Sequence, residues 1–178
     1  QASIEGWPGN GTQENPYIIQ NHEIDANGGS YCIWIENTDV YFVIRNCTLW
    51  NATTTGYPWG SGIRLEHVNN GRLENNKCFN NWWGIHLGMS SNNVITSNNC
   101  YNNFWEGIEL YGSDNNTITN NNCSNNSGRG ISLEYSHRDI VINNTLWNND
   151  IFIFGGWDTH IIENNTVNGK PIYYYKHQ

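Results

Sequence analysis

The sequence contains few charged residues and no long apolar run. Only 13% of its 178 residues are charged, and eight Lys and Arg against sixteen Asp and Glu give a net charge of −8. Because phosphate binding needs clustered basic side chains, this balance argues against a nucleic-acid partner. No apolar stretch approaches the length of a membrane-spanning helix, so we expect no membrane insertion.

Motifs that bind metals or cofactors are also missing. The five cysteines include no CxxC pair of the kind that holds zinc. Asp114, Asp139 and Asp158 occur singly in turn-like segments, whereas a calcium site needs clustered acidic side chains. We therefore expect no metal and no cofactor.

A short repeat is the most informative feature that the sequence does contain. An apolar residue is followed two positions later by Asn or Ser, and three positions after that by another apolar residue. The copies begin at Ile19, Ile44, Leu73, Ile95, Ile118, Val141 and Ile162, and the last four intervals are 22, 23, 23 and 21 residues. Such a short and regular period predicts a solenoid.

A second motif, Ile-x-Leu or Ile-x-Ile, falls between the copies and alternates with the period of a half-buried strand. It occurs at Ile33/Ile35, Ile63/Leu65, Ile85/Leu87, Ile108/Leu110, Ile131/Leu133 and Ile151/Ile153. Asn, Gly, Ser and Asp separate the apolar segments, and these residues favour turns. The pattern predicts an all-β protein, a single parallel β-helix domain of about seven rungs over residues 17–178, with a Gly- and Pro-rich cap over residues 1–16.

The repeats align into columns that predict the core. One inward column contains Ile24, Leu49, Cys78, Cys100, Cys123, Leu146 and Val167. Since Leu and Val share this column, we expect its cysteines to be buried thiols, with one disulfide between adjacent rungs as the alternative. Two positions further on, we expect a ladder of stacked amides, which would explain much of the content of 33 Asn. This ladder would contain Asn51, Asn80, Asn102, Asn125 and Asn148.

Outward positions beside the Ile-x-Leu motif carry the candidate catalytic side chains, Arg64, Glu66, His86, Glu109 and Glu134. Glycoside hydrolysis uses two carboxyl groups roughly 5–9.5 Å apart, and Glu109 and Glu134 fall on adjacent rungs. His86 lies between Arg64 and Glu109 in the alignment and could act as a base. The alternative, which this sequence alone favours, is that these side chains are solvated surface charges with no catalytic role.

Aromatic residues form two further outward groups. The first is a candidate glycan-binding set, because aromatic faces stack on sugar rings; it contains Trp59, Trp82, Trp83, Trp105 and Tyr111. The second is a column of Trp50, Phe79, Tyr101 and Trp147, interrupted by Ser124. Both groups fit equally well a protein interface, or strand side chains that pack on one another.

Sequons of the form N-x-S/T give a hint about the cellular compartment. The Asn-rich repeats generate several of them by accident, which leaves Asn10, Asn115 and Asn122 as the expected glycosylation sites. We therefore expect an extracellular or cell-surface protein whose signal peptide has been removed.

The two ends of a solenoid expose strand edges unless something covers them. The C-terminal segment PIYYYKHQ is expected to begin an unfinished rung that contacts the N-terminal region of a second copy. The contact would involve Ile172, Tyr173 and Tyr174 on one side and Ile4 and Trp7 on the other. Because a head-to-tail contact of this kind does not close, it would give a filament.

A family resemblance rests on three segments, GIHLGMSSNNVITSNNCYNN, GIELYGSDNNTITNNNCSNN and GISLEYSHRDIVINN. They resemble the right-handed parallel β-helix repeats of the NosD-like and carbohydrate-binding/sugar-hydrolase group, as in archaeal cell-surface proteins. The resemblance covers nearly the whole chain and implies a right-handed, single-stranded solenoid. The catalytic Asp clusters of the family's lyases and hydrolases, and a copper-binding cluster, have no match in this sequence.

Three interpretations of function follow from these observations. The first is a non-catalytic extracellular structural or adhesive solenoid that assembles head to tail. The second is a glycan-binding module of a surface protein. The third is a polysaccharide lyase, hydrolase or epimerase.

Overall fold

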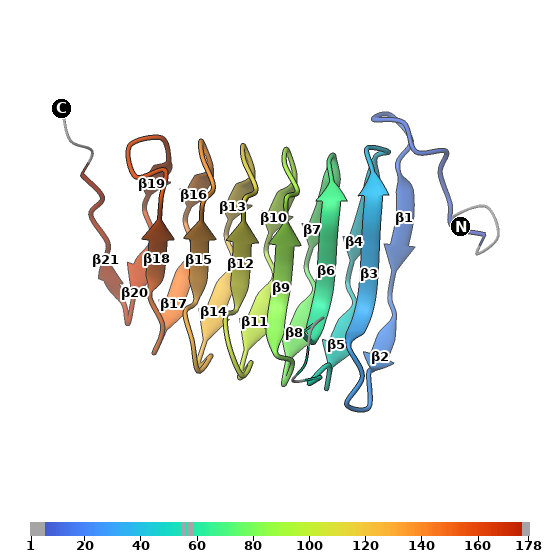
Figure 1. The fold of residues 1–178 in the computed structure, drawn as a ribbon, viewed down its shortest axis with the longest axis horizontal. Helices are drawn as coiled ribbons and strands as arrows, with labels where there is room; N and C mark the ends of the chain where they lie inside the picture. The colour runs from blue at the N-terminus through green and yellow to red at the C-terminus, as the bar shows by residue number, and fades with distance from the viewer. Residues whose placement is uncertain (1–5, 55, 57–58, 176–178) are drawn as a thin grey trace.

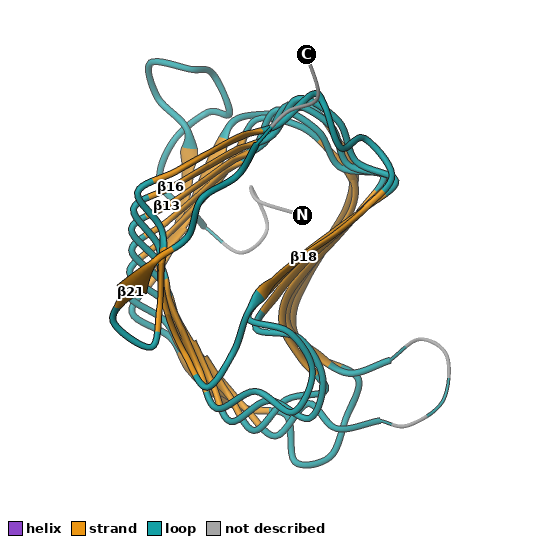
Figure 2. Ribbon diagram, turned by 90° about the vertical axis from the view of Figure 1, so that its left-hand side faces the viewer, coloured by secondary structure: helices purple, strands orange, loops and turns teal. Residues whose placement is uncertain are grey.

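The chain coils into a rod of stacked turns, in which strands from successive turns pair side by side (Figure 1). The computed structural model describes residues 6–54, 56 and 59–175. Within this part of the chain the strands form three sheets, here called A, B and C, and helices are absent. Each turn visits sheet A, then B, then C, and Figure 2 shows the three sheets as the sides of the cross-section.

The strands of the three sheets are short, and all pairs but the last are parallel. Sheet A contains β1 (Tyr17–Gln20), β4 (Phe42–Arg45), β7 (Gly71–Glu74), β10 (Val94–Thr96), β13 (Thr117–Thr119), β16 (Ile140–Ile142) and β19 (Ile161–Glu163). Sheet B contains β2 (Glu23–Asp25), β5 (Thr48–Trp50), β8 (Lys77–Phe79), β11 (Asn99–Tyr101), β14 (Asn122–Ser124), β17 (Thr145–Trp147), β20 (Thr166–Val167) and β21 (Lys170–Pro171). Sheet C contains β3 (Tyr31–Thr38), β6 (Ser61–Val68), β9 (Trp83–Gly88), β12 (Ile108–Tyr111), β15 (Ile131–Glu134) and β18 (Ile151–Phe154).

The registers of these sheets confirm the predicted parallel β-solenoid and its inward columns. Ile95 pairs with Leu73 and Ile118 in sheet A, and Cys100 pairs with Cys78 and Cys123 in sheet B. In the middle turns these inward side chains are fully buried. The three cysteines are free thiols, and the hydrogen bond to Cys100, together with burial, raises the pKa of Cys123. Six strands in sheet C and seven in sheet A come close to the expected seven rungs.

The Asn or Ser of the repeat pattern forms the corner between sheets A and B. It adopts a positive φ in every copy, for example 55° at Asn75, 57° at Ser97 and 57° at Asn120. Asn visits this left-handed conformation more readily than most residues, because its short amide can bond locally. The backbone geometry of the corner therefore explains why the repeat selects this residue type.

The amide ladders lie one residue beyond the positions that we predicted. The predicted column, from Asn51 to Asn148, consists of corner residues with positive φ, and a side-chain bond within it joins Asn148 Nδ2 to Asn125 Oδ1 at 2.8 Å. The continuous ladders contain the next residue of each corner, which points inward and is buried. They are Asn81, Asn103, Asn126 and Asn149 after sheet B, and Asn76, Asn98, Asn121, Asn144 and Asn165 after sheet A.

The ladder amides in the middle of the rod bond to the turns on both sides. Asn98 donates from its backbone nitrogen and from Nδ2 to Asn121 Oδ1, at 2.9 and 3.0 Å, and its Nδ2 also donates to the carbonyl of Leu73 at 2.9 Å. A buried polar group without partners would destabilise the fold. These bonds instead hold three consecutive turns together, and the prediction erred because period-two reasoning does not apply at a left-handed corner.

A column of glycines precedes the Ile-x-Leu motif for a steric reason. Gly62, Gly84 and Gly107 approach the next turn so closely that a Cβ on Gly84 would lie 2.4 Å from the carbonyl oxygen of Gly107. The Cβ on Gly84 would also lie 2.9 Å from Nδ2 of Asn103 in the amide ladder. Any side chain at Gly84 would therefore push adjacent turns apart.

The C-terminal segment does not form the unfinished rung that we predicted. Lys170 and Pro171 pair antiparallel with β20, so the chain turns back on the last strand of sheet B instead of extending sheet C. Ile172 donates its backbone N–H to the carbonyl of Asn165 at 2.9 Å. At the other end, the carbonyls of Pro8 and Gly11 accept hydrogen bonds from Ile18 and Tyr41, which ties residues 8–11 to the first turns.

Candidate functional site

The outward face of sheet C brings all five candidate catalytic residues together. Register places Arg64, His86 and Glu109 in one row across β6, β9 and β12, and Glu66 and Glu134 in the neighbouring row. Figure 2, which looks along the rod, shows that sheet C curves inward between the loops at its two ends. The sequence alone favoured solvated surface charges here, and that expectation is wrong: Arg64, His86 and Glu109 are only 6%, 7% and 8% exposed.

These buried groups are paired in a fixed arrangement. A guanidinium nitrogen of Arg64 lies 2.8 Å from Oε2 of Glu66, and Nδ1 of His86 lies 2.8 Å from Oε2 of Glu109. The ring of Trp83 stacks on His86 with centroids 4.7 Å apart. Its Nε1 donates to Oε2 of Glu106 at 2.8 Å.

Two residues of this cluster were not predicted correctly from the sequence: Glu106 was missed, and Trp83 was placed at the wrong depth. Glu106 was not singled out, although it stands immediately before a Gly-Ile motif as Trp83 does. Trp83 was expected in a solvent-facing turn, whereas it is 9% exposed. In a regular strand, residues three apart point to opposite faces, so Trp83 and His86 would not meet. In the structure the two rings nevertheless stack.

Burial changes the protonation of the cluster. It raises the pKa of Glu109 to about 7, and burial together with the charge of Glu109 raises the pKa of Glu106 to about 7. Burial and then the Arg64 guanidinium lower the pKa of His86 to about 3. Between about pH 3 and pH 7, His86 is therefore neutral and Glu109 carries the proton of the His86–Glu109 pair. The face therefore presents carboxylic acids near neutral pH, when ordinary Glu side chains are ionised.

Aromatic side chains lie at both ends of the sheet C strands. Trp59, Trp82 and Trp105 stack in a row, with centroid distances of 5.1 and 6.1 Å, and Trp105 is 48% exposed. Tyr111 is also exposed and meets the edge of Tyr135 at 5.6 Å. The structure thus places four of the five predicted glycan-binding aromatics within reach of solvent.

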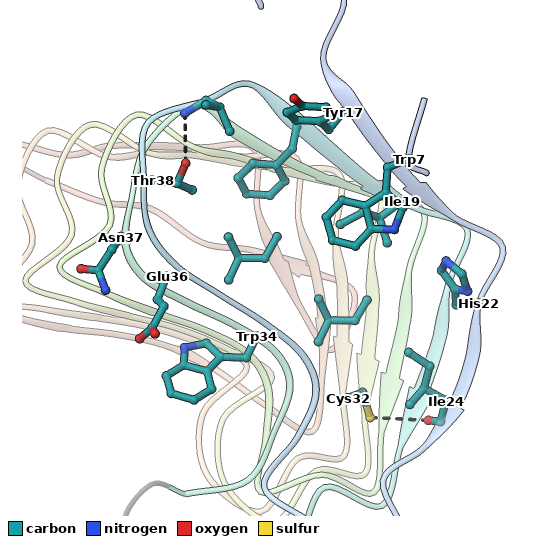
Figure 3. A pocket seen from close by; sticks show the side chains of 14 residues that line it. Trp7, Tyr17, Ile19, His22, Ile24, Cys32, Trp34, Glu36, Asn37 and Thr38 are labelled. Atoms are coloured by element: carbon teal, nitrogen blue, oxygen red, sulfur yellow. Dashed lines mark hydrogen bonds between the residues drawn. The ribbon is translucent and has the colours of Figure 1, made fainter. Parts of the chain in front are cut away.

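The predicted assembly residues lie at opposite ends of the rod. Tyr173 is exposed at the C-terminal end, and Tyr174 packs against the core there, together with Ile151 and Ile153 of the last sheet C strand. A cavity of about 920 Å³ opens at the N-terminal end, with Trp7 among its lining residues (Figure 3). Ile4 lies outside the described residues.

The remaining predictions concern glycosylation, metal binding and membrane insertion. Asn10, Asn115 and Asn122 are exposed. Across residues 6–54, 56 and 59–175, three or more His, Cys, Asp or Glu side chains are nowhere grouped as metal ligands would be. The same part of the chain contains no helix that is long and apolar enough to cross a membrane.

Comparison with a model of the right-handed β-helix region gives a match over residues 9–167. The chain belongs to the right-handed β-helix family. This membership confirms the resemblance that the repeats suggested and the hand of the solenoid. No curated protein matches this β-helix significantly.

Several solved structures share the β-helix fold. The A-module of the mannuronan C-5 epimerase AlgE4 from Azotobacter vinelandii has a TM-score of 0.68 at 17% identity, over 85% of this chain and 46% of that one. The catalytic domain of a GH87 α-1,3-glucanase in complex with nigerose has a TM-score of 0.61 at 19% identity, over 85% and 33%. A double mutant of the periplasmic alginate epimerase AlgG has a TM-score of 0.56 at 16% identity, over 86% and 43%. This β-helix spans less than half the length of each, and identities this low establish the fold alone.

Proposed function

We propose that the outward face of sheet C binds a polysaccharide and transfers protons to it. The observation that carries the proposal is the buried His86–Glu109 pair beside the exposed aromatic row that ends at Trp105. Strongly shifted pKa values in an acid–base pair on an otherwise outward face are typical of a functional site. Aromatic faces and carboxylic acids are the groups that hold sugar rings and their hydroxyls.

The charges of this face favour a neutral polysaccharide over a polyuronate. Four carboxyl groups, those of Glu66, Glu106, Glu109 and Glu134, lie on or beside this face, and the guanidinium of Arg64 is already paired with Glu66. An anionic chain would meet the carboxylate of Glu66 and, as the pH rises through 7, those of Glu106 and Glu109, while the Arg64 guanidinium is already paired. A neutral glucan or mannan avoids this repulsion, since its hydroxyls donate to carboxylates and accept from protonated acids.

The chemistry that this arrangement supports is general acid catalysis at a glycosidic bond. Glu109 retains its proton up to about pH 7 and can donate it to the leaving oxygen. Glu134 lies one strand further and two residues on, so strand and residue spacing put its Cα roughly 8 Å from that of Glu109. Both side chains point outward, and this backbone spacing is compatible with the roughly 5–9.5 Å that separates the carboxyl groups of glycosidases. The solved neighbours that act on mannuronan, alginate or α-1,3-glucan support a carbohydrate role in general terms.

The experiment that tests this proposal separates binding from turnover. The chain is incubated with soluble glucans and mannans and with alginate and polygalacturonate, and products and affinity are measured. We expect Trp105→Ala to weaken binding of the neutral polymers about tenfold, and Glu109→Gln to abolish turnover while binding persists. Trp157→Ala removes an exposed Trp from the segment between β18 and β19 and serves as the control for sheet C. Binding unchanged by Trp105→Ala, or no binding to any polymer, would refute the proposal.

A second candidate function, head-to-tail self-assembly, rests on the ends of the core. Ile33 and Ile35 in the first turn of sheet C are only partly buried, as are Ile151 and Ile153 in the last, whereas their equivalents between them are fully buried. A second copy stacked end to end would cover both sets. Light scattering across concentrations and electron microscopy test this, and Tyr173→Asp should leave a monomer. Assembly that persists in that variant, or a wild-type monomer at every concentration, contradicts it.

We also propose an extracellular location, supported by the exposed sequons at Asn10, Asn115 and Asn122. Mass spectrometry of the protein from its native source would detect glycans on these amides. Glycan-free peptides covering all three sites would remove this support.

A further inference from the structure

The aromatic row on the outside of sheet B is interrupted once, by a small residue. Trp50 stacks on Phe79 with centroids 5.9 Å apart and planes 6° from parallel, and Phe79 stacks on Tyr101 at 5.0 Å and 11°. Register continues the row from Tyr101 to Ser124 and then to Trp147. All five side chains point outward, because the residue before each of them belongs to the inward column of the core.

The interruption leaves a slot with the dimensions of one ring. In this stack the faces of Phe79 are covered by its neighbours, whereas the hydroxymethyl group of Ser124 is too small to cover the next face of Tyr101. Tyr101 and Trp147 are two strand spacings apart, or about 9.6 Å. Stacked rings prefer centroid distances of roughly 4.5–7 Å, so a single inserted ring would contact both walls. Trp147 is 53% exposed and takes part in no ring stacking within the described chain.

The neighbouring row of aromatics ends at the same turn. Gly128 follows Trp105 at the position that would continue the row of Trp59, Trp82 and Trp105, and its backbone N–H donates to the Trp105 carbonyl at 3.1 Å. Both rows therefore cover three successive turns and stop together.

The floor and sides of the slot are polar. The hydroxyl of Ser124 makes no hydrogen bond within the part of the chain that the structure describes, so both its donor and its acceptors are available. Asn122, on the same strand, is exposed, and so is Asn125, whose Oδ1 accepts from Asn148. An aromatic side chain from a partner protein would leave these groups unused. A pyranose offers an apolar ring face for each wall and hydroxyls for Ser124 and the amides.

From this geometry we propose that the slot between Tyr101 and Trp147 is a second carbohydrate site, which holds one pyranose ring of a neutral glycan. The site is on sheet B and shares no residue with the face of sheet C. The proposal of this second site therefore does not depend on the function proposed for the face of sheet C.

The test fills the slot with the residue type that the rest of the row contains. Binding of maltohexaose, cellohexaose, laminarihexaose and mannohexaose to the full chain is measured by calorimetry and by tryptophan fluorescence. In Ser124→Trp the new ring covers Tyr101, and in Trp147→Ala one wall is lost. We expect each change to weaken binding to this site at least tenfold. Trp50→Ala alters the far end of the same row and should leave the affinity of this site unchanged. The losses in Ser124→Trp and Trp147→Ala should be the same in a Trp105→Ala background, which weakens only the face of sheet C.

Three outcomes would overturn the proposal. Ser124→Trp could bind the sugars as tightly as the wild type does, or Trp50→Ala could lose as much affinity as Trp147→Ala. The third is that none of the four sugars binds at millimolar concentration. Tighter binding of N-acetyl-tryptophanamide than of every sugar would assign the slot to a protein partner instead. Circular dichroism verifies that Ser124→Trp is folded, and Trp147→Ala tests the site if it is not.

Discussion

A third buried polar column, just before the sheet A strands, contains Asn93, Asn116 and Asp139. Asp139 therefore stands where the two preceding turns have Asn, and this makes the effect of Asp139→Asn predictable. Its Oδ1 accepts from the backbone nitrogen of Asn116 at 2.8 Å, as the Oδ1 of Asn116 accepts from Asn93 at 2.9 Å. Asp139 and His160 are both fully buried. The backbone nitrogen of Asp139 donates to Nδ1 of His160 at 3.2 Å, so that nitrogen presents its lone pair toward Asp139.

The charged form of Asp139 is therefore unfavourable in the folded protein. Burial, opposed by the hydrogen bonds from Asn116, raises its pKa from 3.8 to about 7, and Asp114 adds to the rise while Arg138 reduces it. Because the folded state binds the proton more tightly, stability is fully present below pH 3.8 and is lost as the pH rises through 7. A shift of this size corresponds to about 4 kcal/mol of unfolding free energy above pH 7.

Asp139→Asn replaces the acid by a neutral isostere. Unfolding free energies from urea titrations should be nearly equal for the two proteins at acidic pH, and the variant should be more stable by a few kcal/mol, at most about 4, above neutrality. The difference between the two proteins isolates this group, because Glu106, Glu109 and His86 titrate in both. Asn116→Asp, one turn earlier in the same column, should be less stable than the wild type, and this loss of stability should grow as the pH rises. A variant less stable than the wild type at alkaline pH, or a difference that is constant with pH, would refute the reasoning.

Three further predictions concern the corners and the core. Asn121→Ala removes a ladder amide and leaves buried backbone groups unpaired, so thermal or urea denaturation should show an unfolding free energy lower by about 2–4 kcal/mol. Its control, Asn120→Gly at the exposed corner beside it, should change the unfolding free energy by less than about 1 kcal/mol. Gly107→Ala should cost about 1–3 kcal/mol in the same assay, because its Cβ would lie 2.7 Å from the carbonyl oxygen of Gly130; a neutral substitution would mean that the turns can separate. Iodoacetamide should label Cys100 only after denaturation, since the thiol is fully buried. Mass spectrometry checks this, and labelling of Cys100 in the native protein would contradict it.

The sequence alone predicted the solenoid because each turn repeats the same local requirements. The inward columns could be read directly, since period-two alternation and the spacing of apolar residues survive in every copy, as in Ile95, Leu73 and Ile118. The corners were harder. A left-handed residue changes which side chain points inward, and this moved the amide ladders from residues such as Asn102 to Asn103. The direction of the last segment depends on pairing with β20, which the residues of PIYYY do not encode locally.

For the candidate site, residue identity determined the ingredients, and only the tertiary structure decided their environment. The alignment placed Arg64, His86 and Glu109 in one outward row, and the registers confirm that placement. The alignment could not show that the row is buried, because burial depends on how sheet C curves and on Trp83, whose ring stacks on His86. That burial is what raises the pKa of Glu109 to about 7, and so it is the folded environment that makes an ordinary glutamate a proton donor near neutral pH.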